Sequence, residues 1–382
     1  MRIVLFGAGK MAYAIAYDLV RNPKVKELTV GDIRVQDARR LARFVGSPKI
    51  KPVQIDATDY SQVLKKTKGS ACVIGSTTYS HNLLLAKACL QARTNFCDLG
   101  GNIYVVEAQR KLSPQAKKAG VTIIPDCGLA PGMVNVLAYH WAKEFDSVDR
   151  LKIRVGGLPQ KSQNLLNYQL VFSVQGLINE YVEDAVILRN GRKQMIPSMT
   201  EVEDLSFTKP YDKLEAFYTS GGTSTLPETL RGKVKDLDYK TIRYPGHAQH
   251  IKLLMDLGLF ASQPVPLGRH KAVPRQLCAY LLTRYLPSNQ PDVVLIRVEI
   301  KGKLKGKRKH LAYDCIDCYD YKSDLTSMQR TTGFPVAIIA QMLAEGKIEK
   351  KGVVPQELAV PAEQLLQELH QRNIRFRRRV IP

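Results

Sequence analysis

The chain has 382 residues and a formal net charge of +22 at pH 7, with 45% hydrophobic and 24% charged residues. This length predicts two domains, and this composition is typical of a globular protein rather than a disordered or fibrous one. No apolar run is long enough to cross a bilayer, and the chain opens on a strand pattern that leaves no room for an export signal. We therefore expect a cytoplasmic protein with no membrane partner.

The first third of the chain alternates short apolar segments with amphipathic ones. We predict strands at 3–6, 28–30, 51–55, 71–74, 95–98 and 121–124, and helices at 10–21, 36–45, 60–66, 81–92 and 105–119. This alternation is typical of βαβ units around a parallel sheet that is buried on both faces. Right-handed crossovers then give the doubly wound Rossmann topology.

Strands dominate the pattern after residue 126. We predict a helix at 131–144, strands at 151–155, 168–174, 182–188 and 240–243, an antiparallel pair formed by 293–300 and 310–320, and helices at 334–345 and 361–372. The predicted fold class is α/β, with a Rossmann sheet and a second, α+β domain that has a mostly antiparallel sheet. We expect residues 1–130 to bind NAD, helices within 331–382 to complete that domain, and residues 131–330 to form the substrate-binding and dimerisation domain.

The sharpest motif is Gly7-Ala8-Gly9-Lys10-Met11-Ala12, which matches GxGxxA between a predicted strand and a predicted helix. Gly7 permits the tight turn, Gly9 lets the backbone approach a pyrophosphate, and Ala12 keeps the helix close to the strand. The phosphates would then lie at the helix N-terminus, over the free N–H groups of residues such as Lys10 and Met11. This segment predicts a dinucleotide site.

Other coenzyme contacts are expected at the ends of the next strands. Asp32 follows the second strand, where a carboxylate binds the ribose hydroxyls and repels a 2′-phosphate, so NAD is favoured over NADP, although nearby Arg34 weakens that preference. Asp56 is placed to face the adenine, or else to cap a helix. Ser76 and Thr77 end the fourth strand and suit a close approach to the ribose and nicotinamide.

Two strand ends carry a carboxylate beside flexible backbone. Asp98 precedes Leu-Gly-Gly-Asn, and Asp126 precedes Cys-Gly-Leu-Ala-Pro-Gly. Ligands of open α/β sheets bind at these carboxyl ends, so Asp98 is a candidate coenzyme contact and Asp126 a candidate catalytic residue. Both stretches are also compatible with purely structural turns.

Five segments together resemble the saccharopine dehydrogenase-like family, in the right order over the whole chain. They are 126–135, 172–181, 219–228, 242–247 and 327–335. Chain length and the Gly-Gly-Thr-Ser-Thr-Leu-Pro-Glu segment are most similar to the L-lysine 6-dehydrogenase branch, which oxidises the ε-amine of lysine with NAD and releases ammonia. Saccharopine-forming relatives commonly carry an aspartate where this chain has Ala130. The resemblance implies an NAD-dependent oxidoreductase of amino-acid metabolism that forms a homodimer, through its antiparallel sheet, or a larger homo-oligomer.

Amine oxidation needs a neutral amine, and therefore a base or a desolvating pocket, because an ammonium of pKa near ~10.4 holds its proton at neutral pH. Within the family-like segments Glu180 and His247 are candidate catalytic residues, beside Asp126. Glu180 is equally compatible with a surface cap or ion pair, and His247 with a structural histidine.

An amino-acid substrate also needs a cation for its carboxylate, ideally an arginine. Arg243 is the candidate, with a surface arginine as the alternative. Tyr168, Asn179 and Thr223 are further candidates for substrate binding. A saccharopine- or carboxynorspermidine-type C–N oxidoreductase, the alternative reaction, needs a second cation, which Arg154 or Arg330 would supply.

The remaining charge and the cysteines suggest no further ligand. Two basic segments, 301–309 and 375–379, carry only one aromatic residue between them, Phe376, and no nucleic-acid-binding motif, so no nucleic-acid partner is expected. A non-catalytic NAD-binding regulator or nucleic-acid binder is the remaining alternative. Cys315 and Cys318 have CxxC spacing, but no second pair completes a zinc site, so no metal is expected.

Overall fold

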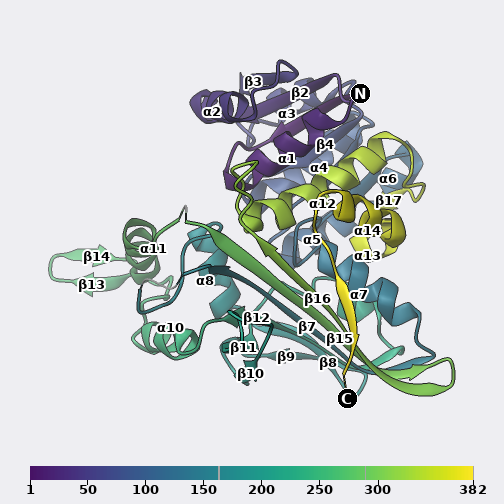
Figure 1. Ribbon diagram of the computed structural model, residues 1–382. Coiled ribbons are helices and arrows are strands. Elements are labelled where there is room, and N and C mark those ends of the chain that lie inside the picture. Colours follow the sequence, from purple (N-terminus) through teal and green to yellow (C-terminus); the bar gives the residue numbers. More distant parts are fainter. Residues whose placement is uncertain (162–163, 289, 382) are drawn as a thin grey trace. The chain divides into compact units, whose positions relative to one another are not determined.

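The computed structural model describes residues 1–161, 164–288 and 290–381, which form two compact units (Figure 1). Unit 1 comprises Met1–Lys143, Ser224–Leu226 and Gln329–Arg375. Unit 2 comprises Glu144–Thr223, Pro227–Met328 and Phe376–Pro382. The first expected boundary was at 130/131, whereas the first observed change of unit is at 143/144, so the helix that follows the sixth strand belongs to unit 1.

Unit 1 contains the predicted parallel sheet. Its order is β17-β6-β5-β4-β1-β2-β3, and every pairing is parallel. The strands are β1 (Arg2–Phe6), β2 (Glu27–Asp32), β3 (Ile50–Gln54), β4 (Cys72–Gly75), β5 (Asn95–Asp98), β6 (Thr122–Ile124) and β17 (Gly352–Val353). The strand order reverses between β1 and β4, which is where dinucleotides bind in Rossmann folds. The predicted α/β fold is confirmed.

The helices of unit 1 follow the predicted pattern, with one split. They are α1 (Lys10–Arg21), α2 (Val35–Val45), α3 (Tyr60–Thr67), α4 (Asn82–Gln91), α5 (Ile103–Arg110), α6 (Ser113–Ala119), α7 (Met133–Lys143), α12 (Ser327–Ala344, shared with unit 2), α13 (Gln356–Ala359) and α14 (Ala362–Gln371), with a short 3₁₀ turn, η1 (Tyr79–His81), before α4. The prediction of one helix over 105–119 was wrong. Pro114 lies in the first turn of α6, and a proline in that position begins a helix but cannot continue one.

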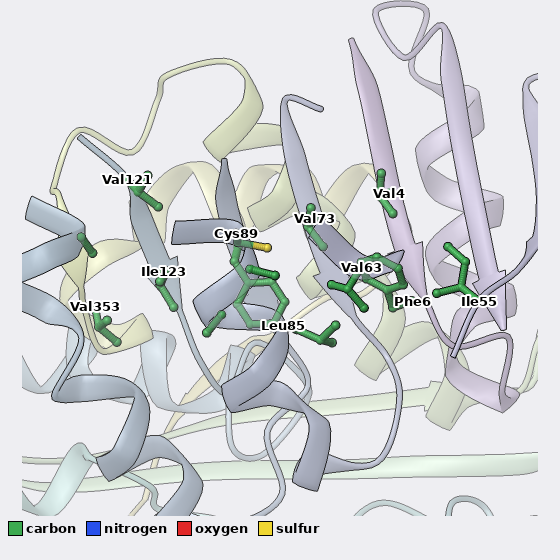
Figure 2. Packing of buried hydrophobic residues seen from close by; sticks show 14 residues of the cluster. Val4, Phe6, Ile55, Val63, Val73, Leu85, Cys89, Val121, Ile123 and Val353 are labelled. Carbon is green, nitrogen blue, oxygen red and sulfur yellow. The ribbon is translucent and has the colours of Figure 1, made fainter. Parts of the chain in front are cut away.

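Buried apolar residues of the strands and the helices form the core of unit 1. Val4, Phe6, Val73, Phe96 and Ile123 come from four central strands and pack on Leu85 and Cys89 of α4 (Figure 2). On α12, Gly333 permits close packing on α1, because a Cβ there would lie 2.8 Å from the Cβ of Ala14. This packing fixes the carboxyl ends of the strands, where the candidate site lies.

Unit 2 is built on a nine-stranded mixed sheet. Its main path runs β10-β11-β12-β7-β15-β16-β18, with β8 and β9 off that path. The strands are β7 (Ser147–Pro159), β8 (Ala185–Arg189), β9 (Arg192–Ile196), β10 (Glu203–Leu205), β11 (Leu214–Tyr218), β12 (Val234–Arg243), β15 (Asp292–Leu304), β16 (Lys307–Cys318) and β18 (Arg377–Val380). The predicted antiparallel pair is β15 with β16, and β12 with β7 is a parallel pair in this otherwise antiparallel sheet.

The remaining elements of unit 2 correct the prediction for 168–188. A strand at 168–174 was wrong: residues 168–173 are irregular, and Ser173 caps α8 (Val174–Val182) by accepting a hydrogen bond from the Gly176 amide. The strand predicted at 182–188 begins later because α8 continues to Val182. Other elements, which were not predicted, are α9 (Leu226–Thr229, shared between the units), α10 (His247–Asp256), α11 (Pro274–Tyr285) and the hairpin of β13 (Val265–Leu267) and β14 (His270–Ala272).

The seven cysteines form no disulfide in the described structure; six are buried and one is exposed. Cys315 is buried and Cys318 exposed, because residues three apart on a strand point to opposite faces of the sheet. The described part of the chain contains no group of three or more side chains arranged to hold a metal ion, and no helix in it is long and apolar enough to span a membrane.

Candidate functional site

The turn between β1 and α1 has the backbone that a dinucleotide requires. Gly7 has φ +97°, and a Cβ there would lie 2.5 Å from the carbonyl oxygen of Ser76. Gly9 is the N-cap of α1, and a Cβ there would meet nothing within 4 Å, so the space above it is open to a ligand. Lys10 and Met11 form the first turn of the helix. The residues present therefore fit the pyrophosphate of a dinucleotide coenzyme.

Asp32 joins this turn to the end of β2. Its carboxylate accepts hydrogen bonds from the amides of Ala8, at 2.8 Å, and Arg34, at 2.9 Å. The Arg34 side chain is held away by an ion pair to Asp37, with Nε···Oδ2 at 2.7 Å, and Arg40 binds the same carboxylate at 3.4 Å. Asp32 is thus fixed at the position from which a carboxylate reaches the ribose hydroxyls.

The residues expected near the rest of the coenzyme differ in their surroundings. Asp56 accepts two hydrogen bonds from Thr58 that hold the pKa of its carboxyl below the ordinary value; the N-cap of α3 is Asp59. The Ser76 hydroxyl is buried and has no partner among the described residues, whereas the Thr77 hydroxyl donates to the carbonyl of Thr78. Asn82, which sequence reasoning missed, also has a buried side-chain oxygen without a described partner. Ser76 and Asn82 therefore offer unused polar atoms at the end of β4.

Asp98, at the end of β5, lies beside Asp126, which follows β6. Asp98 Oδ1 accepts hydrogen bonds from the amides of Gly100, at 2.8 Å, and Asp126, at 3.2 Å, and Oδ2 accepts one from Gln109 Nε2 at 2.7 Å. Burial raises the pKa of Asp98 to about 6, although these hydrogen bonds oppose the shift. Gln109, on α5, was missed because nothing in its local sequence distinguishes it.

Asp126 has the features of an acid–base group. Burial, together with the charge of Asp98, raises its pKa to about 7. Oδ2 accepts a hydrogen bond from the Ser224 hydroxyl, and Oδ1 is buried with no partner in the described chain. A side chain at Gly100 would overlap Oδ1, so glycine there preserves space for the carboxylate. A buried carboxyl that is half-protonated near neutral pH is able to accept and return a proton.

In unit 2, Arg243 lies at the end of β12 in an aromatic enclosure. Its side chain is buried, its guanidinium carbon lies 4.8 Å from the ring centroid of Tyr168, and Nε donates to the hydroxyl of Tyr181 at 3.3 Å. No carboxylate of the described residues forms an ion pair with it. A buried guanidinium without a carboxylate partner is costly unless a ligand supplies the anion.

Two further candidates lie around this arginine. Tyr168 is buried, and its hydroxyl has no described partner. Glu180, on α8, is half-buried; desolvation raises the pKa of its carboxyl to about 7, and the nearby charge of Arg243 limits that rise. Sequence reasoning placed Arg243, Tyr168 and Glu180 among the candidates, and the fold brings them together in unit 2.

His247, the first residue of α10, has both ring nitrogens engaged. Nδ1 lies 2.8 Å from the carbonyl of Leu166, and Nε2 lies 2.9 Å from the hydroxyl of Tyr181. The carbonyl requires a proton on Nδ1, so Tyr181 donates to Nε2. Burial, reinforced by the charge of Arg243, lowers the pKa of His247 to about 3. The imidazole is therefore neutral and orients Tyr181, which sequence reasoning missed.

Asn179 and Thr223 have partners of their own within unit 2. The side-chain oxygen of Asn179 accepts a hydrogen bond from Arg275, and the Thr223 hydroxyl donates to the carbonyl of Val186 at 3.1 Å. These contacts hold α8 and the segment after β11 in place, whereas Arg243 forms no ion pair with a carboxylate in the described part of the chain.

Family models match nearly the whole chain. Residues 3–124 match the saccharopine dehydrogenase NADP-binding domain, and residues 128–374 match the saccharopine dehydrogenase C-terminal domain. The chain belongs to the saccharopine dehydrogenase family. The resemblance identified in the sequence is thereby confirmed, and unit 1 contains the nucleotide-binding domain of this family.

Relatives in the saccharopine dehydrogenase family carry several activities. The chain is 28% identical to the saccharopine dehydrogenase [NADP(+), L-glutamate-forming] of Saccharomyces cerevisiae, over 67% of this chain and 58% of that protein. It is 22% identical to the carboxynorspermidine synthase of Vibrio cholerae, over 94% and 93% of the two chains. Among the first relatives, such as mouse alpha-aminoadipic semialdehyde synthase, the match spans only about half of the other protein, 45% in that case.

A solved structure has the same fold. Apo saccharopine dehydrogenase (L-Glu forming) from Saccharomyces cerevisiae superposes with a TM-score of 0.81 over 100% of both chains, at 21% identity. The α/β architecture described above is thus that of a saccharopine dehydrogenase.

Proposed function

We propose that this chain is an NAD-dependent oxidoreductase that deaminates the ε-amine of L-lysine to the semialdehyde. The observation that carries the proposal is Arg243, a buried cation that lacks a carboxylate partner among the described residues. An amino-acid carboxylate would complete this enclosure through charge-assisted hydrogen bonds.

Arg154, one of the two other candidate arginines, favours a substrate with a single carboxylate at this site. It is already bound by Glu203, with Nε···Oε1 at 2.5 Å, and by Asp238. It is therefore not left for a second substrate carboxylate, which saccharopine-type substrates carry and lysine does not. Arg330 lies in unit 1, where it donates to the carbonyl of Arg372 at 3.1 Å.

The coenzyme proposal rests on Asp32 and Asp37. Asp32 presents a carboxylate where a 2′-phosphate would be repelled, and Asp37 holds Arg34 and Arg40, the cations that would otherwise attract that phosphate. We infer a preference for NAD, although the family model is named for NADP binding. The bound coenzyme would accept the hydride from the carbon that carries the amine.

Asp126 is our candidate for the proton transfers. Its carboxylate takes a proton from the substrate ammonium, so that the nitrogen lone pair supports departure of the hydride. Once that proton has passed to solvent, the carboxylate activates the water that attacks the resulting iminium carbon, and ammonia leaves. The balance is neutral amine, NAD⁺ and water giving aldehyde, ammonia, NADH and a proton. A pKa of about 7 suits a group that must alternate between both protonation states.

The other candidates receive supporting roles. Glu180 is a second acid–base candidate, and Tyr168 a hydrogen-bonding group for the substrate. We assign His247 to positioning, through Tyr181, because both of its nitrogens are engaged. Asn179 and Thr223 remain weaker candidates for substrate binding, since their side chains already bind Arg275 and the Val186 carbonyl.

An amine panel tests the proposal. NADH formation is measured with L-lysine, with saccharopine and with lysine lacking its carboxylate (cadaverine), each with NAD and with NADP. We expect lysine with NAD to give the highest kcat/KM. Activity with saccharopine alone would replace the proposal with the second candidate.

That second candidate is a saccharopine- or carboxynorspermidine-type C–N oxidoreductase. The observation that favours it is the coverage of two relatives along their whole lengths, the carboxynorspermidine synthase and, at 22% identity over 92% and 91%, a carboxyaminopropylagmatine dehydrogenase of Synechocystis. Such an enzyme would join an amine to a carbonyl compound reductively, consuming rather than forming reduced coenzyme.

We further propose a cytoplasmic homo-oligomer. Reduced thiols suit a cytoplasmic location.

Eight large apolar side chains are exposed in one 33-residue stretch of unit 2: Leu253, Leu257, Val265, Leu267, Leu277, Tyr280, Leu281 and Tyr285. A two-stranded hairpin such as β13–β14 is marginal without cover, so a second copy is the expected occupant. Light scattering at micromolar concentration tests this, and a monomer would contradict it.

A further inference from the structure

The fold brings together the two basic segments that were separate in the sequence. β18 pairs with β16 in antiparallel register, Asp314 with Arg377 and Leu311 with Val380 (Figure 1). The turn between β15 and β16 carries the other basic segment, 301–309. Both segments therefore belong to the nine-stranded sheet of unit 2, one to its edge strand β18 and the other to the turn that joins β15 and β16.

The register shows which of these cations share a face. Arg150 on β7 is opposite Lys301 on β15, and Lys152 is opposite Glu299. Glu299 is in turn opposite Ala312 of β16, which is opposite Arg379 of β18. Since alternate residues share a face, Lys303 also joins it. We call Arg150, Lys152, Lys301, Lys303 and Arg377 the basic face.

The carboxylates that lie among these strands already have partners. Asp149 binds Arg308 and Lys235, Glu299 binds His310 at 2.7 Å, and Asp314 binds Arg297 and Arg379, at 2.7 and 2.9 Å. On β12, Asp236 lies opposite Arg150 and accepts a hydrogen bond from the Asn190 amide, and Asp238 lies opposite Lys152 and binds Arg154. In contrast, the five members of the basic face form no ion pair with any residue that the structure describes. All are exposed except Lys152, which is half-buried.

Two pairs of like charge lie directly opposite one another on this surface. Arg150 faces Lys301 across β7 and β15, with Asp236 on its other side, and Lys303 faces Arg308, which binds Asp149, across β15 and β16. Cross-strand pairs of like charge destabilise a sheet, and a bound polyanion would relieve the repulsion that the neighbouring carboxylates leave.

We propose that the basic face binds the phosphate backbone of a nucleic-acid duplex without sequence preference. Register neighbours on this face are glutamate, histidine, alanine and aspartate, so it offers no aromatic ring to stack on unpaired bases. It also lacks the apolar side chains that would enter a membrane or form the centre of a protein interface. Exposed cations that form no ion pair suit a ligand that presents regularly spaced negative charge and is held by release of counterions.

Fluorescence anisotropy of the intact protein with a short mixed-sequence DNA duplex, over a range of salt concentrations, tests the proposal. The test variant combines Arg150→Gln, Lys301→Gln and Lys303→Gln. The control combines Lys65→Gln, Lys66→Gln and Lys118→Gln, which removes the same charge from exposed helix ends in unit 1. We expect the slope of log K against log salt to flatten by about 0.9 for each lost contact, so by roughly 2 to 3 in the test variant. The control keeps the wild-type slope.

Three results would overturn the proposal. They are no binding at low salt, equal weakening in both variants, which indicates a diffuse field, or equally tight binding of polyglutamate or anionic vesicles. Coenzyme titrations of the same variants separate this inference from the proposed function, because neither variant changes a residue of the candidate site.

Discussion

The carboxylate of Asp98 accepts a hydrogen bond from the backbone amide of Asp126, with N···O at 3.2 Å. The end of β5 thereby fixes the backbone that follows β6, where Asp126 has the left-handed φ of +59°. The same proximity places two carboxyl groups in one buried region. Burial raises the pKa of both carboxyls, and the charge of Asp98 adds to the rise at Asp126, so Asp126 holds a proton up to about neutral pH.

Replacing Asp126 with Asn should abolish the acid–base step and retain the coenzyme. We expect kcat to fall by about 10²- to 10⁴-fold. In a plot of kcat/KM against pH, the wild-type value should rise with an apparent pKa of about 7, because Asp126 loses its proton there. This rising limb of the profile should disappear in the variant. Ser224→Ala should move the limb to higher pH, because the Ser224 hydroxyl stabilises the carboxylate. An unchanged limb in Asp126→Asn would assign the ionisation to another group, with Glu180 next.

The same pKa shift predicts how stability depends on pH. Folding raises the pKa of Asp126 from 3.8 to about 7, so the folded state binds the proton more tightly. The tighter binding of this proton stabilises the folded state. That stabilisation is fully present below pH 3.8 and is lost as pH rises through about 7. Asp126→Asn should therefore be more stable relative to wild type at pH 8 than at pH 5, measured by urea unfolding. An opposite trend would contradict burial as the cause of the shift.

Gly100→Ala tests the space around Asp126. Both Gly100 and Gly120 have positive φ, +71° and +69°, but a Cβ at Gly100 overlaps Asp126 whereas one at Gly120 meets nothing within 4 Å. Gly120→Ala should cost about 1–2 kcal/mol of stability and leave kcat unchanged. Gly100→Ala should lose more stability and most of its activity. Equal behaviour of the two variants would show that Asp126 has room to move.

Arg243→Gln should weaken substrate binding selectively. Loss of a buried charged partner costs about 2–5 kcal/mol, so kcat/KM for lysine should fall by at least about 30-fold, and Arg243→Lys should recover little, since an ammonium lacks the planar fork. Cadaverine, which lacks the carboxylate, should be oxidised equally slowly by wild type and variant. The affinity for NADH, measured by calorimetry, is the control for folding. An equal loss with cadaverine would show that Arg243 does not bind the carboxylate.

Asp32 and Asp37 should set the choice of coenzyme. Asp32→Ala should weaken the binding of NADH. The ratio of the NADPH to the NADH dissociation constant should fall by about tenfold, because about 1.4 kcal/mol of discrimination against NADPH is removed. Asp37→Asn should act in the same direction by a smaller factor, because exposed ion pairs such as Asp37 with Arg34 contribute little. Calorimetric titration gives both constants. A wild-type preference for NADPH would contradict the assignment.

The nucleotide-binding end was largely predictable from the sequence. The turn at Gly7, the helix Lys10–Arg21 and the strand Asn95–Asp98 follow from local apolar periodicity and glycine spacing, which the structure reproduces at these bounds. Parallel strands buried on both faces give short continuous apolar runs, and their regular alternation with amphipathic segments is what indicated the βαβ units.

Long-range partners were not predictable. Gln109 and Ser224 reach Asp98 and Asp126 from segments 11 and 98 residues away in sequence, and no local pattern indicates such contacts. The neutral state of His247 also depends on burial and on Arg243, so its sequence alone suggested a base. A strand was predicted at 168–174, but residues 168–173 are irregular and Ser173 caps the helix that begins at Val174.

Initial-rate measurement of NADH formation from NAD and L-lysine, beside saccharopine and cadaverine, tests the central claim most directly. We expect the wild-type protein to form NADH steadily with lysine and much more slowly with cadaverine. We expect Arg243→Gln to keep near-wild-type affinity for the coenzyme but to turn over little lysine. No NADH from lysine, together with reduction of NAD or NADP by saccharopine, would contradict it.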